Sequence, residues 1–211
     1  MMTVTLTERD LDFLETLTCR VSMFTLRQIA GVWWPNERNP NRVRRRLSRL
    51  AKAGWINRHV VNARAPLWPL CPLFGWRPGG EAPDANHIAS AIRSRLLQAP
   101  RPTEIFVASP LAANLHGSIA PRLSPHRRDH QLRLAAVYVH YRTKLPDLDG
   151  LWSNQDSRPS TADETSEFNA LLTDKDGRPL RAIQVAGRWA AVRILDFHDH
   201  CASAGLPYEL W

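Results

Sequence analysis

The stretch PNRVRRRLSRLAKAG, residues 40–54, decides the fold that we predict for the first part of this chain. With about 100° of rotation per helical residue, its apolar side chains fall on one narrow stripe, and Gly54 is placed to end the helix. The stripe consists of Val43, Leu47, Leu50 and Ala51. The opposite face contains Asn41, Arg42, Arg45, Arg49 and Lys52, with Arg44 and Arg46 on its flanks. A cationic face on an apolar seam is suited to phosphate contact and major-groove reading, and the alternative is an ordinary helix with a solvated basic face.

Two further helices are predicted before this one. Thr7, followed by Asp10 three residues later, is typical of a capping box at the start of a helix. Ser22 or Thr25 can cap a second, shorter helix. The apolar residues assigned to that helix are Phe24, Leu26, Ile29 and Val32. Pro40 is then suited to the first turn of the third helix.

A strand and its return are predicted after the third helix. Residues 55–61 alternate as a strand, residues 62–65 form a turn, and residues 66–70 lead back. Three helices followed by a two-stranded ribbon with a basic tip are typical of a winged helix-turn-helix, whose third helix enters the major groove. Arg45 and Arg49 are then the predicted base contacts. The predicted phosphate contacts are Arg42, Lys52, Arg58 and Arg64.

The charge is distributed unevenly along the chain. Residues 1–60 contain 11 Lys and Arg against 5 Asp and Glu, whereas residues 131–211 contain 9 against 11. The formal net charge of the whole chain is +8. A basic front and a slightly acidic back indicate that only the first part of the chain meets a polyanion.

The composition excludes several classes of protein. No apolar run approaches the roughly 20 residues of a membrane helix, and no secretory signal is expected. Cys19, Cys71 and Cys201 lack the paired spacing of a zinc site or a disulfide framework. His198 and His200 stand two residues apart, and ligands that share a helix face stand three or four apart, so a helix-end charge cluster is favoured over a metal site. We expect a cytoplasmic, nucleoid-associated protein with no metal and no cofactor.

The second half of the chain is predicted to form a small α/β domain. Residues 73–103 are a Pro/Gly-rich bridge with one helix that Asp84 can cap, and this bridge separates residues 1–72 from residues 104–211. The elements predicted in the second domain are a strand at 104–108, helices at 110–116, 130–142 and 189–204, a polar loop at 154–167, a β-hairpin over 168–186 and a last strand at 208–211. The predicted fold class is therefore α+β.

The whole chain resembles the bacterial replication-relaxation-type proteins, which join an N-terminal winged helix to a restriction-endonuclease-like domain. The matching segments are TERDLDFLETL and NRVRRRLSRLAKAGWI at the front, and HQLRLAAVYVHYR, NALLTDKDGRPLRAIQVAG and FHDHCASAGLPYELW at the back. The resemblance implies that the hairpin over residues 168–186 occupies the position of the nuclease active site.

In active nucleases of that fold, an aspartate begins the first hairpin strand and Glu-x-Lys lies on the second, where they hold Mg²⁺ and orient water. The corresponding residues here are Asn169, Gln184 and Ala186. Neutral amides are poor ligands for a hard cation. The resemblance therefore implies a domain that keeps the fold without the chemistry, and the protein is not expected to be an enzyme.

These features predict a sequence-specific, double-stranded DNA-binding protein that acts as a transcriptional or plasmid and replicon-control regulator. The second domain is expected to form a homodimer, to position the first domain or to bind another protein. The expected dimer surface consists of residues 132–141 and the C-terminal strand. One alternative is a metal-dependent nuclease with a displaced site, for which Glu164 and Glu167 are the nearest carboxylates. Another is an adaptor that uses the winged helix for protein contacts.

Overall fold

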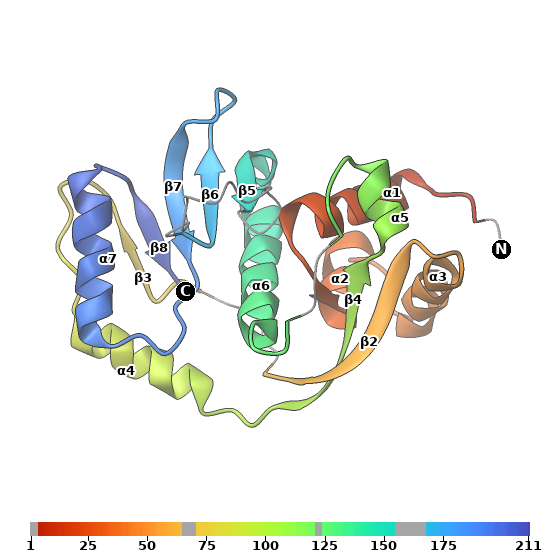
Figure 1. The fold of residues 1–211 in the computed structure, drawn as a ribbon, viewed down its shortest axis with the longest axis horizontal. Helices are drawn as coiled ribbons and strands as arrows, with labels where there is room; N and C mark the ends of the chain where they lie inside the picture. Colours follow the sequence, from red (N-terminus) through yellow and green to blue (C-terminus); the bar gives the residue numbers. More distant parts are fainter. Residues whose placement is uncertain (1–3, 65–70, 121–123, 155–167) are drawn as a thin grey trace.

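Two β-sheets lie on either side of one long central helix in the computed structural model of this protein (Figure 1). The structure describes residues 4–64, 71–120, 124–154 and 168–211. Within these ranges, the chain is a mixed α and β protein with seven α-helices. The predicted elements at 66–70 and most of the loop at 154–167 lie outside the described residues, as do Glu164 and Glu167.

The first two helices begin where their capping signals predict. Helix α1, Glu8–Glu15, starts after Thr7, whose hydroxyl oxygen accepts from the backbone N–H of Asp10 while the Asp10 carboxylate accepts from the N–H of Thr7. One turn of π-helix, Thr16–Arg20, extends it. Helix α2, Leu26–Trp33, starts after Thr25. Phe24 is not part of α2, because it lies in the short strand β1, Phe24–Thr25.

Helix α3, Pro40–Lys52, has both ends where the sequence predicts them. Asn39 caps its start, and Pro40 occupies the first turn, where its missing N–H costs nothing. Gly54 follows the helix with a φ of 82°, a conformation that L-residues with side chains rarely adopt. This left-handed turn lets the Trp55 N–H donate to the Leu50 carbonyl and directs the chain into strand β2, Ile56–Ala63.

The first sheet has the strand order β1-β4-β2, and this corrects the predicted ribbon. Strand β2 does not pair with a return strand at 66–70. Its antiparallel partner over its whole length is β4, Arg101–Ala108, from the pair Ile56 and Ala108 to the pair Ala63 and Arg101. Residues 62 and 63, predicted as a turn, therefore belong to the strand. The alternation of apolar residues in β2 indicates a strand that must pair with another strand, but it does not show which strand that is.

The segment between β2 and β4 joins the second sheet, so the predicted domain boundaries do not follow the strand pairing. Strand β3, Phe74–Trp76, pairs with β8, Tyr208–Leu210. Helix α4, Ala85–Leu96, is capped by Asp84 as predicted and packs against α7, Ala191–Ser203. Residues 73–97 are thus a built part of the second unit, not a bridge, and residues 104–108 belong to the first sheet.

The second sheet has the order β3-β8-β7-β6-β5 and is covered on both faces. The predicted hairpin is present as β6, Ala170–Thr173, and β7, Pro179–Gln184, and β8 lies parallel to β7. Side chains alternate along β7: Ile183 packs in one cluster with the central helix α6, whereas Ala182 packs in another with α4 and α7. The remaining elements are α5, Pro110–Leu115, α6, Arg128–Lys144, a 3-10 helix, Pro146–Leu151, and β5, Trp152–Asn154.

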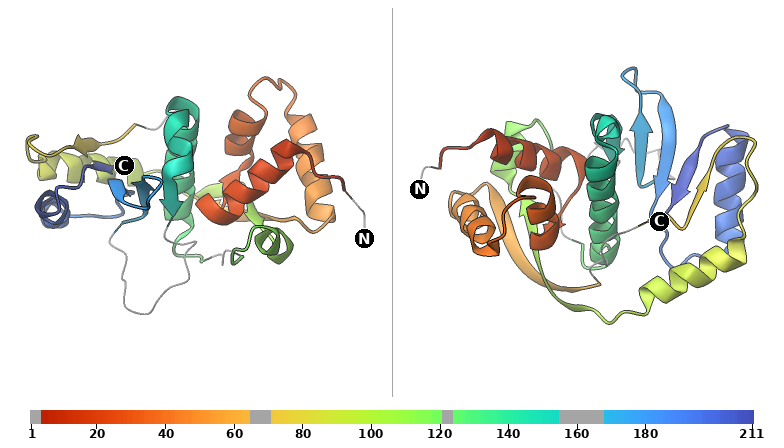
Figure 2. Two further views of the ribbon diagram at one scale, coloured as in Figure 1. Left: turned by 90° about the horizontal axis from the view of Figure 1, so that it is seen from above. Right: turned by 180° about the vertical axis from the view of Figure 1, so that it is seen from behind.

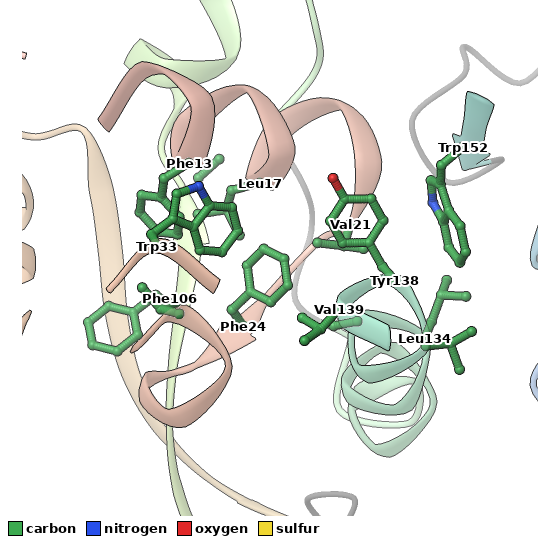
Figure 3. Packing of buried hydrophobic residues seen from close by; sticks show 14 of the residues in the cluster. Phe13, Leu17, Val21, Phe24, Trp33, Phe106, Leu134, Tyr138, Val139 and Trp152 are labelled. Carbon is green, nitrogen blue, oxygen red and sulfur yellow. The ribbon is translucent and has the colours of Figure 1, made fainter. Parts of the chain in front are cut away.

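Helix α6 is buried on most of its surface and joins the two halves into one core. Viewed from above, it lies between α1–α3 and the second sheet (Figure 2). Edge-to-face and tilted aromatic contacts run from Phe13 through Trp33 and Phe24 to Tyr138 and Trp152 (Figure 3). Each such contact adds about 0.5–1.5 kcal/mol to ordinary apolar burial.

The dimer surface predicted from the sequence is not available. The apolar side chains of α6 from Leu132 to Tyr141 are at most 3% exposed, and β8 lies inside the second sheet between β3 and β7. The all-round apolar pattern of this helix reflects burial between two layers of the same chain.

Candidate nucleic-acid interface

Helix α3 turns one face into the core and the other to solvent. Val43, Leu47 and Leu50 are at most 1% exposed and pack in the same cluster as α1 and α2. After Pro40, the exposed side chains of the helix are Asn41, Arg42, Arg44, Arg45, Ser48, Arg49 and Lys52. The interpretation of α3 as a basic helix on an apolar seam is confirmed in its geometry.

Most of the exposed cations on α3 are not neutralised. Arg42 forms an ion pair with Glu37 at 3.3 Å, but the Arg42 side chain is 68% exposed, and such a pair is worth less than about 1 kcal/mol. In the part of the chain that the structure describes, the other four cations of this face form no ion pair. They are Arg44, Arg45, Arg49 and Lys52. No acidic residue occurs in the sequence between Glu37 and Glu81.

Arg46 differs from its neighbours because its guanidinium binds a buried carboxylate. Its guanidinium donates to both carboxylate oxygens of Asp10, which is 1% exposed, and to the Thr5 carbonyl. Burial alone raises the pKa of Asp10, but hydrogen bonds from Arg46 and Thr7 outweigh it and hold that pKa below its ordinary value. Arg46, predicted among the DNA contacts, therefore fastens α3 to α1.

A groove of about 350 Å³ separates α3 from the first sheet. Arg44 and Arg45 line it from the helix, and Arg58, Glu104 and Phe106 line it from β2 and β4. Arg58 is opposite Phe106 in the strand register and forms an ion pair with Glu104, yet its side chain is 62% exposed. Arg58 thus lies beside the cationic face of α3, as a phosphate contact requires.

Arg64 lies at the far end of β2 and serves another purpose. Its backbone N–H and its guanidinium both donate to the Asp129 carboxylate, at 2.8 and 2.9 Å, and its Nε donates to the Gln98 carbonyl at 2.7 Å. These bonds hold β2 to the start of α6. The prediction of Arg64 as a phosphate contact at the tip of a wing does not fit this arrangement, because no tight β2–β4 turn exists there.

Asn169 and Gln184 are brought together on the hairpin, and both amide side chains bind backbone groups. The Asn169 Oδ1 accepts from the Val185 N–H at 2.7 Å, and the Gln184 Oε1 accepts from the Asn169 N–H at 3.2 Å. Ala186 is 1% exposed, and its carbonyl accepts from Arg133. The side-chain oxygens of both amides thus fasten β6 to β7.

Glu209 is not among the predicted site residues, yet its carboxylate binds three side chains of the described ranges. It accepts from the Tyr141 hydroxyl at 2.6 Å, from Arg181 at 2.7 Å and from the Trp211 indole at 3.0 Å. Burial and the Glu209 charge raise the pKa of Tyr141. A lone acidic residue in a C-terminal strand carries no local signal for such a network, which links α6 to the sheet.

The residues of the His198–Cys201 segment point to different surroundings. His198 is buried and shares a hydrogen bond with the Tyr208 hydroxyl at 3.0 Å, whereas His200 is exposed. Among the described residues, no cluster of three or more His, Cys, Asp or Glu side chains has the geometry to hold a metal ion.

Over the described ranges, no helix has both the length and the apolar character needed to cross a bilayer. Comparison of the chain with protein-family models, curated proteins and solved structures gave no match.

Proposed function

We propose that this protein binds double-stranded DNA in a sequence-specific manner and acts as a transcriptional or replicon-control regulator. The observation that carries the proposal is the face of α3, on which Arg44, Arg45, Arg49 and Lys52 are exposed and form no ion pair with the described residues. Holding so many like charges together disfavours the free protein and favours a polyanionic partner.

The topology supports a winged-helix interpretation of the first unit. Strand β1 precedes α2, strand β2 follows α3, and β4 lies between the two strands in the sheet. Three helices with such a sheet are the framework in which a third helix is presented to the major groove. In this interpretation, the loop that usually forms the wing is extended into the long segment that carries β3 and α4.

In this proposal, some side chains of the α3 face contact bases and others contact phosphates. Arg45 and Arg49 are four residues apart and share the centre of the face, from which bidentate contact to guanine edges is possible. Arg42, Lys52 and Arg58 flank them and are exposed, and in this proposal they contact phosphates. The ion pair of Arg46 with Asp10 sets the orientation of α3 relative to α1.

The test is a fluorescence-anisotropy titration of labelled duplex DNA at several salt concentrations. The logarithm of the affinity should fall linearly with the logarithm of the salt concentration, with a slope of roughly −0.9 per phosphate contacted. Replacing Arg42 and Lys52 by Gln should reduce the magnitude of that slope by about 1 for each residue. Selection of bound sequences from a random duplex library then identifies the preferred site.

The matched control is the double variant Lys175→Gln and Arg178→Gln, which removes two exposed cations from the β6–β7 turn. This variant should retain the slope of the parent. The proposal fails if the parent does not bind duplex DNA in low salt, or if the control variant loses as much of the slope as the α3 variant. Binding to another protein through an intact α3 face, with no DNA binding, would favour the adaptor.

A further inference from the structure

A cavity of about 590 Å³ lies between α2, α6 and the first half of β4, and a residue of α3 reaches its edge. This volume is within the range of about 300–1,000 Å³ that is typical of sites for small organic ligands. The three elements are neighbours in the fold (Figure 1). The cavity is separate from the amide pair of the second sheet, which lies on the other side of α6.

The floor of the cavity offers apolar contact and no unpaired polar side chain. Leu26 and Pro102 supply accessible carbon surface from α2 and β4, and Ala136 and Val139, at most 2% exposed, close the bottom of the cavity. The four uncharged polar side chains of the lining are already hydrogen-bonded within the chain. Thr25 donates to Gln28, which donates to the Leu132 carbonyl. Thr103 donates to the Arg101 carbonyl and Thr143 to the Val139 carbonyl. A ligand body that fits this floor is therefore apolar.

The rim of the cavity is cationic. Arg27, Arg44, Arg101 and Lys144 line it, all four are exposed, and none forms an ion pair with another described residue. The one carboxylate of the lining, Glu104, is paired with Arg58. Cations from four elements that converge on one apolar cavity complement a ligand with an apolar body and an anionic head.

We propose that this cavity binds a small organic anion, such as an aromatic or alkyl carboxylate or sulfonate. The apolar body lies against Leu26 and Pro102, and the anionic head is held by the rim cations. Binding also has a consequence that rests on the proposed function. Arg44 and Glu104 line both this cavity and the groove beside α3, so an anion that recruits Arg44 lowers the affinity for DNA.

The experiment titrates the protein without DNA, with 8-anilinonaphthalene-1-sulfonate as the anionic probe and uncharged N-phenyl-1-naphthylamine as its matched apolar analogue. Fluorescence should report saturable binding of one sulfonate probe per protein. The neutral analogue should bind about tenfold more weakly, because it lacks the charge-assisted hydrogen bonds. Equal affinity of the two probes would overturn the anionic part of the proposal.

Gly31→Phe tests whether the probe occupies this cavity. A Cβ at Gly31 meets no atom within 4 Å, so a side chain enters open space at the cavity wall without displacing α2. The variant should weaken sulfonate binding by about tenfold or more. Ser90→Phe, at an exposed position of α4, adds the same side chain elsewhere and should bind the probe as the parent does.

A second pair of variants tests the rim independently of any filling of the cavity. Arg101→Ser with Lys144→Ser should weaken the sulfonate probe by about tenfold and leave the neutral analogue unchanged. Lys175→Ser with Arg178→Ser removes two cations far from the cavity and should change neither. The proposal is overturned if the parent shows no saturable binding, or if both Gly31→Phe and the rim variant bind the sulfonate as tightly as the parent.

The link to DNA is measured separately, by adding unlabelled duplex DNA to the protein–sulfonate complex. If the probe lowers the affinity for DNA, then DNA must equally lower the affinity for the probe, so adding DNA should displace the probe and reduce its fluorescence. Arg44→Ser should abolish that reduction. If the protein binds no DNA, the probe titrations still decide the cavity proposal alone. If it binds both without mutual effect, the cavity remains a ligand site and the link through Arg44 is wrong.

Discussion

The exposed face of α3 and the Asn169–Gln184 amide pair both consist of polar groups, but they differ in how far those groups are paired within the chain. Asn169 and Gln184 direct their oxygens to backbone N–H groups of the same hairpin. Arg45 and Arg49 are exposed, and neither forms an ion pair with a described residue. Polar groups satisfied within the chain maintain the fold, whereas an uncompensated charge on a rigid helix is available for a partner.

The largest expected effect concerns the exposed arginines of α3. Replacing Arg45 and Arg49 together by Ala should weaken binding to a selected duplex by about 2–6 kcal/mol, at roughly 1–3 kcal/mol for each base-reading arginine. The measurement is a titration of the selected site and of a scrambled site at one salt concentration. Unchanged discrimination between the two sites in the double variant would show that α3 does not read the sequence.

Asp10→Asn tests Arg46, the α3 cation that is paired with a buried carboxylate. We expect the free energy of unfolding to fall by about 2–3 kcal/mol, because the variant leaves Arg46 without its anionic partner and weakens the α1 cap. Chemical denaturation at neutral pH measures the change. Glu15→Gln, at an exposed position of the same helix, should change the stability little.

The pH dependence of that difference is a further check on its cause. The pKa of Asp10 is lower in the folded protein than its ordinary value of 3.8, so the folded state stabilises the charged form. This contribution is present above the ordinary value and is lost as the pH falls through the lowered pKa. The stability of the parent should therefore approach that of Asp10→Asn below about pH 4. A difference independent of pH would contradict an ionic origin.

Asn169→Ala tests the amide pair, whose oxygens bind backbone N–H groups. The substitution leaves the Val185 N–H without its acceptor and should destabilise the fold by about 1–2 kcal/mol, while DNA affinity stays within error of the parent. Denaturation and the duplex titration, carried out on the same preparation, separate the two effects. If the variant is fully folded but binds DNA more weakly than the parent, the β6–β7 hairpin is part of the DNA-binding surface.

The smallest expected effect is an absence of DNA cleavage in Mg²⁺ or Mn²⁺. Asn169, Gln184 and Ala186 supply neither a carboxylate for the metal nor a lysine, and the two amide oxygens are engaged with backbone. Incubation with plasmid and linear DNA is the measurement. Cleavage that disappears in Gln184→Ala would revive the nuclease alternative, whereas cleavage that survives would point to a contaminant or to another site.

The helices and the hairpin were predictable from the sequence because their signals are local. Thr7 and Asp10, Thr25, and Asn39 with Pro40 lie within a few residues of the backbone groups that they satisfy. Gly177, with a φ of 80°, likewise lies in the turn that joins β6 to β7. The cationic face of α3 was predictable for the same reason, since a helical period places its residues without reference to the rest of the chain.

Only the tertiary structure decided which strands pair and which charges remain free. β2 has the pattern of a half-buried strand, but the same pattern fits a partner near at hand or one that returns after a long segment, and the partner here is β4. In the sequence alone, Arg46 and Arg49 are two arginines of the same basic run, and nothing distinguishes them. One binds Asp10 and the other is exposed, because an ion pair depends on contacts between residues distant in sequence, which no local pattern records.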